Sequence, residues 1–182
     1  MGSNKDWDEL VLEHFGDVFN ILVDLPGHGE SILPGNIKYS VMLDTLQQQL
    51  IEKNIQSIIP IGYSMGGRVA LHLQNRFPEY VRAIIGLSTA PGLKTDPERR
   101  QRQLSDTALI KKIKSSGFIP FLKDWYGLDL FQSINKNKKL KSSLIRTRSQ
   151  NNVAQLGLSI DQLGNGSMPS LWEKLEDMNL PI

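Results

Sequence analysis

The chain has 182 residues, of which 40% are hydrophobic and 22% are charged, and its formal net charge is +2. These values are ordinary for one globular domain, and so small a basic excess does not indicate a nucleic-acid partner. Cysteine is absent, which excludes disulfides and thiolate metal sites. No apolar run approaches the ~20 residues of a membrane span and the first residues lack the layout of a signal peptide. We therefore expect a cytoplasmic protein, or an organellar one if a targeting segment has been removed.

Helical and strand patterns alternate along the first ninety residues. Apolar spacing predicts helices over residues 5–15, 40–53 and 65–76, and strands over residues 18–24, 56–61 and 81–88. This alternation is typical of a parallel sheet covered by helices on both faces, so the fold class is α/β.

From Pro97 to about Asp177 the pattern changes to short helical stretches with no convincing strand. The lysine- and arginine-rich runs in this segment are typical of solvated helix faces. Helices inserted after the third strand would lie above the carboxyl ends of the strands, where α/β sheets bind their ligands.

The stretch Gly62-Tyr63-Ser64-Met65-Gly66 lies between an apolar strand pattern and a helical pattern. A Gly-x-Ser-x-Gly sequence in this context predicts a nucleophile elbow, in which the serine is held in a strained turn so that its hydroxyl projects from the sheet. We expect that side chains at Gly62 and Gly66 would collide across so tight a turn. The amide of Met65 would then lie at the start of the next helix, where it can stabilise an oxyanion. The alternative is a chance glycine-rich turn.

Several motifs along the chain resemble those of one family. The elbow and the loop Asp24-Leu25-Pro26-Gly27-His28-Gly29 resemble the α/β-hydrolase superfamily. Further motifs are similar to those of the 2-succinyl-6-hydroxy-2,4-cyclohexadiene-1-carboxylate synthases, a family of the menaquinone and phylloquinone pathway. These motifs are Pro91-Gly92-Leu93-Lys94, Glu98-Arg99 to Asp106, Asp124-Trp125-Tyr126, Arg148-Ser149-Gln150-Asn151-Asn152 and Pro169-Ser170-Leu171-Trp172.

The resemblance implies a partial α/β-hydrolase fold with a helical cap. Residues 1–92 would form part of the core with the elbow, residues 93–168 the cap, and residues 169–182 a return toward the core. It also implies a carbon–oxygen lyase without a cofactor or metal. The enzyme would eliminate pyruvate from 2-succinyl-5-enolpyruvyl-6-hydroxy-3-cyclohexene-1-carboxylate and leave 2-succinyl-6-hydroxy-2,4-cyclohexadiene-1-carboxylate.

The resemblance also assigns roles to seven residues. Ser64 would be the catalytic base and the Met65 amide an oxyanion donor. The small polycarboxylate substrate would be bound by Tyr63, Arg68, Arg102, Trp125 and Arg148. Arginine suits this task because its planar guanidinium binds a carboxylate through two parallel hydrogen bonds. Solvated helix positions for Arg102 and Arg148, and a core position for Trp125, are the alternatives.

The chain departs from the family pattern at both ends. After Ser64 its only histidine is His72, in the helix that leaves the elbow, although the triad order is serine, acid, histidine. The family's aspartate would follow a strand beginning near Leu180, and the His-Gly-Phe part of its oxyanion loop would precede Met1. We therefore expect a truncated chain that is inactive by itself. An ester or thioester hydrolase, and a non-catalytic remnant that binds carboxylates or a partner chain, remain alternatives, and the oligomeric state is open.

Overall fold

A computed structural model describes residues 1–178 of the chain. The chain divides into two compact units. The first consists of Met1–Pro34 and Thr107–Ser159, and the second of Gly35–Asp106 and the residues from Ile160 on. Each unit is described by itself.

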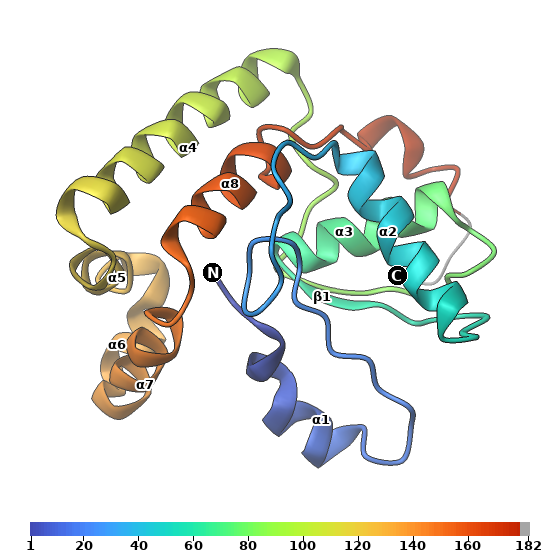
Figure 1. Cartoon of the computed structure of the whole chain (residues 1–182), viewed down its shortest axis with the longest axis horizontal. Helices are drawn as coiled ribbons and strands as arrows, with labels where there is room; N and C mark the ends of the chain where they lie inside the picture. The colour runs from blue at the N-terminus through green and yellow to red at the C-terminus, as the bar shows by residue number, and fades with distance from the viewer. Residues whose placement is uncertain (179–182) are drawn as a thin grey trace. The chain divides into compact units, whose positions relative to one another are not determined.

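The first unit is helical. Its N-terminal segment forms the 3₁₀-helix η1 (Asn4–Trp7) and helix α1 (Asp8–His14), as the sequence predicted for residues 5–15. The C-terminal part of α4 (Asp96–Ser116) and the following helices complete it. These are α5 (Phe118–Trp125), η2 (Asp129–Phe131), α6 (Gln132–Lys136), α7 (Lys138–Arg148) and the first part of α8 (Val153–Leu163) (Figure 1). The core of this unit is a buried cluster of Ile113, Phe121, Leu122 and Tyr126.

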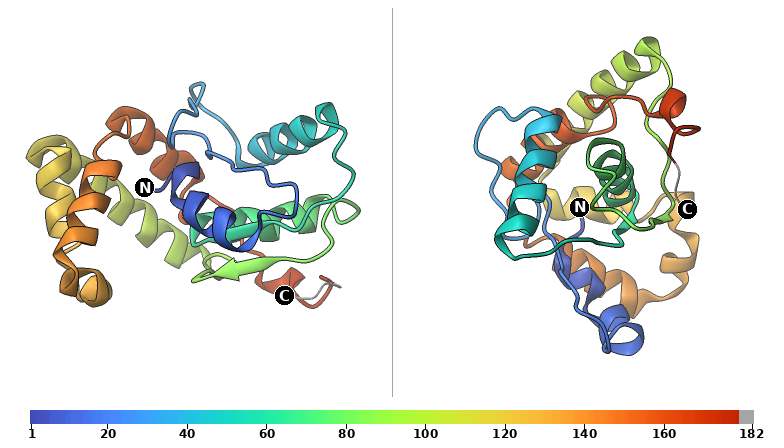
Figure 2. Two further views of the ribbon diagram at one scale, coloured as in Figure 1. Left: turned by 90° about the horizontal axis from the view of Figure 1, so that it is seen from below. Right: turned by 90° about the vertical axis from the view of Figure 1, so that its right-hand side faces the viewer.

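The second unit contains the sheet and the predicted elbow. Strand β1 (Ile61–Tyr63) leads into helix α3 (Met65–Arg76), and β2 (Ile85–Leu87) pairs with β1 in parallel, so that Ile61 lies opposite Ile85. The predicted parallel pairing is therefore confirmed. Helix α2 (Tyr39–Glu52) packs against α3 (Figure 2). Residues 164–171 connect α8 to the 3₁₀-helix η3 (Trp172–Lys174), and we call them the returning segment.

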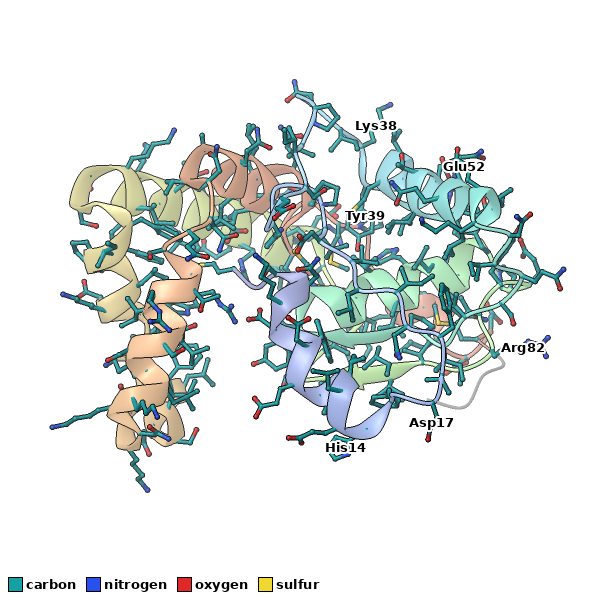
Figure 3. All side chains as sticks on the ribbon, turned by 60° about the horizontal axis from the view of Figure 1, so that its bottom comes forward. His14, Asp17, Lys38, Tyr39, Glu52 and Arg82 are labelled. Carbon is teal, nitrogen blue, oxygen red and sulfur yellow. The ribbon has the colours of Figure 1, made fainter. Side chains whose placement is uncertain are left out.

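Tyr39 is the residue through which α2 meets α3. Its ring is buried and lies edge-on to the ring of His72, with 4.7 Å between the ring centroids. Figure 3 shows the neighbouring Lys38 side chain turned away from this contact. One turn further along α3, the Arg76 guanidinium donates two hydrogen bonds to Asp44 of α2, at 2.5 and 2.8 Å. The first half of α2 is thus held against the C-terminal half of α3.

The predicted strand over residues 18–24 is wrong. These residues form no strand, and Val18 and Phe19 are 59% and 80% exposed. A strand needs a partner for its backbone groups, and none pairs with this segment within residues 1–178. The Asn20 side chain instead donates to the backbone carbonyls of Phe15 and Val18, which favours a local turn over a ladder.

The other two predicted strands are present but shorter and shifted. Ile58 forms an isolated parallel bridge with Val81, and the regular ladder begins only at Ile61. Pro60 separates the two parts because it has no N–H to donate, although its carbonyl accepts from Ile85.

Across the described part of the chain, no helix combines the length and apolar character needed to cross a membrane.

Candidate active site around Ser64

Ser64 occupies the turn between β1 and α3 in a strained backbone conformation. Its φ of 50° and ψ of −104° lie in a region that residues with a side chain rarely adopt, at a cost of about 1–3 kcal/mol. Three hydrogen bonds hold it there. Its amide donates to the Leu87 carbonyl at 2.8 Å, and its carbonyl accepts from the Arg68 amide at 3.2 Å and from Thr89 Oγ1 at 2.9 Å. The geometry is that of a nucleophile elbow.

The elbow glycines differ in their reasons for lacking a side chain. A Cβ at Gly62 would lie well inside 3.0 Å of the backbone of Gly66 and Gly67, as the sequence predicted. A Cβ at Gly66 would meet nothing within 4 Å, so the expected collision at that position is wrong. The turn brings the backbone of Gly66 against Gly62, while the Cβ direction of Gly66 points into open space. Gly67 is the second crowded position, because its Cβ would lie 2.7 Å from the Thr89 side chain.

Two groups of the elbow have no hydrogen-bond partner among residues 1–178. They are the half-buried hydroxyl of Ser64 and the amide of Met65, the first residue of α3. The helix dipole places partial positive charge at this amide, so it is suited to stabilise an anionic oxygen. Tyr63, which precedes the serine, is 59% exposed.

Arg68 lies one turn into α3. Its Nε is buried and has no hydrogen-bond partner, and no carboxylate lies within 4.0 Å of its guanidinium in the described chain. Burial lowers the pKa of Arg68; Tyr39 and Asp106 partly oppose this shift, whereas Arg102 adds to it. A cation near a helix N-terminus opposes the helix dipole, so neither the dipole nor a counter-ion explains its position.

Arg102 is a second cation near Arg68, in helix α4. Its Nε donates to Asp106 Oδ1 at 2.8 Å, one turn further along the same helix. The Asp106 side chain is 6% exposed and that of Arg102 is 45% exposed. The carboxylate therefore holds the guanidinium from one side and leaves the other side accessible.

The sequence profile of the family described as alpha/beta hydrolase fold matches residues 2–172 of the chain. A Bacillus subtilis protein named provisionally as a 2-succinyl-6-hydroxy-2,4-cyclohexadiene-1-carboxylate synthase is 36% identical over the whole chain and 67% of its own length. The chain belongs to this synthase family of α/β-hydrolase-fold proteins.

Solved structures agree with this family. The structure of MenH from S. aureus matches 98% of the chain and 68% of its own length, with a TM-score of 0.87 and 31% identity. A thermophilic esterase from Thermogutta terrifontis reaches a TM-score of 0.75 at 19% identity over 98% of the chain and 65% of its own, which shows the fold alone. The chain spans about two thirds of the length of these relatives.

The remaining two predicted site residues of this synthase-family chain lie in the first unit. Trp125 packs between Phe121 and Phe131, with ring-centroid distances of 5.8 and 6.0 Å. The Arg148 side chain is 13% exposed and forms an ion pair with Asp6, so it is not a freely solvated arginine. Substrate binding by either residue stays a prediction. The position predicted for the family's aspartate, after Leu180, lies outside the described residues.

Thr89 and Tyr39, which the sequence did not single out, shape the elbow region together with His72. Thr89 bonds the Ser64 carbonyl, and the only local signal for it was its place just after the third predicted strand. Tyr39 and His72 are buried beside Arg68, and Tyr39 Oη and His72 Nε2 have no hydrogen-bond partner in the described residues. Burial lowers the pKa of His72 to about 4, so the ring is neutral near pH 7. Burial also raises the pKa of Tyr39.

Proposed function

We propose that this chain takes part in the elimination of pyruvate from 2-succinyl-5-enolpyruvyl-6-hydroxy-3-cyclohexene-1-carboxylate. The product is 2-succinyl-6-hydroxy-2,4-cyclohexadiene-1-carboxylate. The observation that supports it most directly is the elbow. Within residues 1–178, Ser64 is held in a strained turn with no partner for its hydroxyl or for the neighbouring Met65 amide, and the same helix carries Arg68, which has no ion pair there. Membership of the synthase family supports the choice of reaction.

In this proposal the elbow performs two tasks. A base removes a proton from C2 of the substrate ring, and the electron pair forms a double bond between C2 and C3. The existing double bond between C3 and C4 shifts to C4 and C5, and the carbon–oxygen bond from C5 to the enolpyruvyl group breaks. The leaving enolate takes up a proton and becomes pyruvate. Ser64 is the group placed to accept the first proton, and the Met65 amide is placed to stabilise negative charge that develops on a substrate oxygen. Deprotonation of Ser64 requires a neighbouring base. His72 does not fill this role in the proposal, because its ring is buried against Tyr39.

The arginines supply the charge that a polycarboxylate substrate needs. Arg68 is partly desolvated and has no counter-ion among the described residues, so an incoming carboxylate would satisfy it. Arg102 is oriented by Asp106 and would bind a second carboxylate through its accessible side. We include Arg148, Trp125 and Tyr63 in the proposed substrate-binding set on the family motifs.

The test uses a chimera, because the 182 residues contain no histidine after Ser64 other than His72. Residues 2–172 would replace the matching segment of the Bacillus subtilis relative, which supplies the rest of its own chain. We expect the chimera to release pyruvate, and Ser64→Ala in the chimera to reduce turnover by a factor of about 10⁴ or more. Ester cleavage without pyruvate release would instead support a hydrolase. If Ser64→Ala kept both pyruvate release and ester cleavage, Ser64 would be excluded as the base.

The same chimera tests the arginines. Arg68→Ala, Arg102→Ala and Arg148→Ala should each cost about 2–5 kcal/mol of transition-state binding, because a buried substrate carboxylate is left unpaired. Exposed Arg146 on α7 is the matched control and should change kcat/KM by less than about twofold. An arginine variant that behaves like the control would be removed from the proposed site. The cytoplasmic location stays a prediction.

A further inference from the structure

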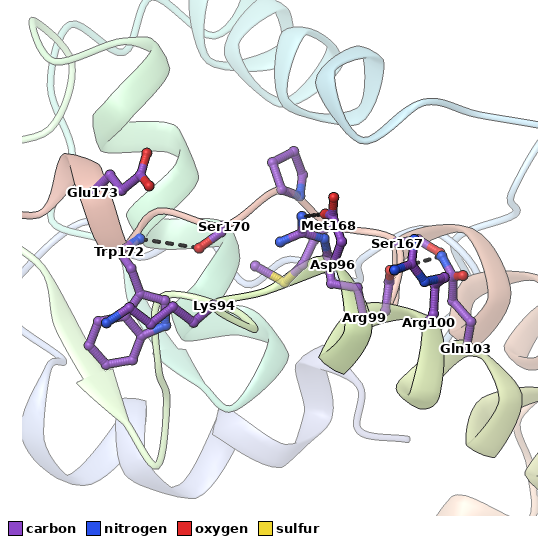
Figure 4. Close-up of a pocket in the computed structure, with 12 residues that line it drawn as sticks. Lys94, Asp96, Arg99, Arg100, Gln103, Ser167, Met168, Ser170, Trp172 and Glu173 are labelled. Carbon is purple, nitrogen blue, oxygen red and sulfur yellow. Dashed lines mark hydrogen bonds and ion pairs between the residues drawn. The ribbon is translucent and has the colours of Figure 1, made fainter.

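The second unit contains a cavity of about 530 Å³ whose lining includes neither Ser64 nor Arg68 nor Arg102. It lies between the first turns of α4 and the segment that leads into η3 (Figure 4). Its size suits a small molecule. The lining residues are Lys94, Asp96, Arg99, Arg100, Gln103, Gly166, Ser167, Met168, Pro169, Ser170, Trp172 and Glu173.

One wall of this cavity is an aromatic ring that is fixed in place. Trp172 Nε1 donates to the Gly92 carbonyl at 2.9 Å, and the Leu171 amide donates to the Pro91 carbonyl at 2.9 Å. Trp172 is nevertheless 42% exposed, and Lys94 Nζ lies 6.0 Å from the centre of its ring. A rigid, accessible indole with a cation over its face is a surface on which a flat, negatively charged molecule can stack.

The opposite wall is cationic and is also held by backbone contacts. Arg99 Nη1 donates to the Leu93 carbonyl at 3.1 Å, and the same guanidinium pairs with Asp96. Gln103 Nε2 donates to the Gly166 carbonyl at 3.0 Å, which ties α4 to the returning segment. These polar groups are therefore held in place by hydrogen bonds and an ion pair within the protein.

The charges of the lining favour an anion. Asp96 is already paired with Arg99, whereas Lys94 and Arg100 have no ion pair in the part of the chain that the structure describes. Glu173 is the remaining acid, and Figure 4 shows its side chain leaving η3 in the opposite direction from the Trp172 ring. The lining thus contains two exposed cations, Lys94 and Arg100, and the Trp172 ring points away from the Glu173 carboxylate.

We propose that this cavity is a second ligand site, which binds a small carboxylic acid with a planar ring. The ring lies on the Trp172 indole, and the carboxylate pairs with the Lys94 ammonium, whose Nζ lies 6.0 Å from the centre of that ring. The site does not depend on the elimination reaction, because it shares no side chain with the elbow.

The probe is benzene-1,2-dicarboxylate, titrated calorimetrically into the 182-residue protein. Two comparison ligands separate the contributions: cyclohexane-1,2-dicarboxylate keeps the charges without the planar ring, and inorganic phosphate keeps only the charge. We expect the aromatic acid to bind about fivefold or more tightly than either, because it alone stacks on the indole. Equal binding of phosphate would show a general anion effect and overturn the proposal.

Variants locate the binding. Lys94→Gln, an exposed position, should weaken the aromatic acid about tenfold, since a charged hydrogen bond is lost. Trp172→Leu should weaken the binding of the aromatic acid about fivefold. Trp172→Phe keeps an aromatic ring and should bind the acid more tightly than Trp172→Leu, so it provides a test if the leucine variant is poorly folded. Arg146→Gln is the charge-matched control and should not change the affinity. Binding that is lost in Arg68→Gln but kept in Lys94→Gln would assign the ligand to the elbow and refute the second site.

Discussion

Alanine at Gly62 and alanine at Gly66 should have opposite effects on stability, although both glycines belong to the same elbow motif. A methyl group at Gly62 would overlap the backbone of Gly66 and Gly67, which cannot move aside as a flexible side chain can. Overpacking costs about 1–3 kcal/mol where side chains can adjust, so we expect Gly62→Ala to lose about 3 kcal/mol or more. A methyl group at Gly66 meets nothing within 4 Å, and alanine favours the helix, so Gly66→Ala should be neutral or stabilising by up to about 1 kcal/mol.

The two variants are compared by urea unfolding of the 182-residue protein, followed by circular dichroism. Because the slope of unfolding free energy with urea depends on the surface exposed, an unchanged slope would show that a shifted midpoint reports stability. Gly62→Ala should move the midpoint to lower urea, whereas Gly66→Ala should leave it or raise it. Equal stability of Gly62→Ala and the parent protein, or a larger loss for Gly66→Ala than for Gly62→Ala, would refute the described geometry of the turn.

Three further outcomes are expected. Ser64→Gly should be about 1 kcal/mol more stable than Ser64→Ala in the same unfolding assay, since glycine adopts the positive φ without strain; equal stabilities would argue against the strained turn. Burial lowers the pKa of His72 to about 4 from 6.5, so the unfolded chain binds the extra proton first and stability should fall as pH drops from about 6.5 to 4. His72→Leu should flatten this dependence by up to about 3 kcal/mol, whereas exposed His14→Gln should leave it unchanged. The 182-residue chain alone should release pyruvate about 10⁴-fold more slowly than the chimera, and rates within tenfold of each other would show that some other group activates Ser64.

The elbow could be predicted from sequence because its causes are local. Gly-x-Ser-x-Gly between an apolar run and a helical pattern specifies the turn, and the resulting φ of Ser64 and the crowding at Gly62 follow from a few neighbouring residues. The same motif does not say which way each Cβ points. The open space at Gly66 therefore became visible only in the structure.

The strand predicted over residues 18–24 failed because strand formation depends on a distant partner. The apolar composition of Val18–Asp24 is that of a strand, yet its backbone groups find no ladder within the described chain. Local competition from the Asn20 side chain then decides the conformation. The helices were easier to predict, because their hydrogen bonds lie within four residues along the chain.

The unpaired polar groups near the elbow could not be inferred from composition at all. Tyr39 Oη, Arg68 Nε and His72 Nε2 are each ordinary in sequence, and their burial without a hydrogen-bond partner among residues 1–178 is visible only once α2 is packed on α3. Buried polar groups are usually satisfied because leaving one unpaired costs about 1–3 kcal/mol. Their presence next to a strained serine indicates that this part of the fold is not optimised for stability.

These features of the elbow have one common explanation. Ser64 is strained, its hydroxyl and the Met65 amide are unbonded, and Arg68 has no counter-ion in the described residues. The strain at Ser64 and the buried, unpaired Nε of Arg68 lower stability, and the hydrogen bonds that Ser64 donates to Leu87 and accepts from Thr89 hold the turn against the strain. Proteins retain such local costs where a ligand or a reaction uses the unsatisfied groups. An anionic substrate that accepts from the Met65 amide and pairs with Arg68 would satisfy two of these groups at once, so the groups that lack a partner in the described residues are those that the proposed reaction requires.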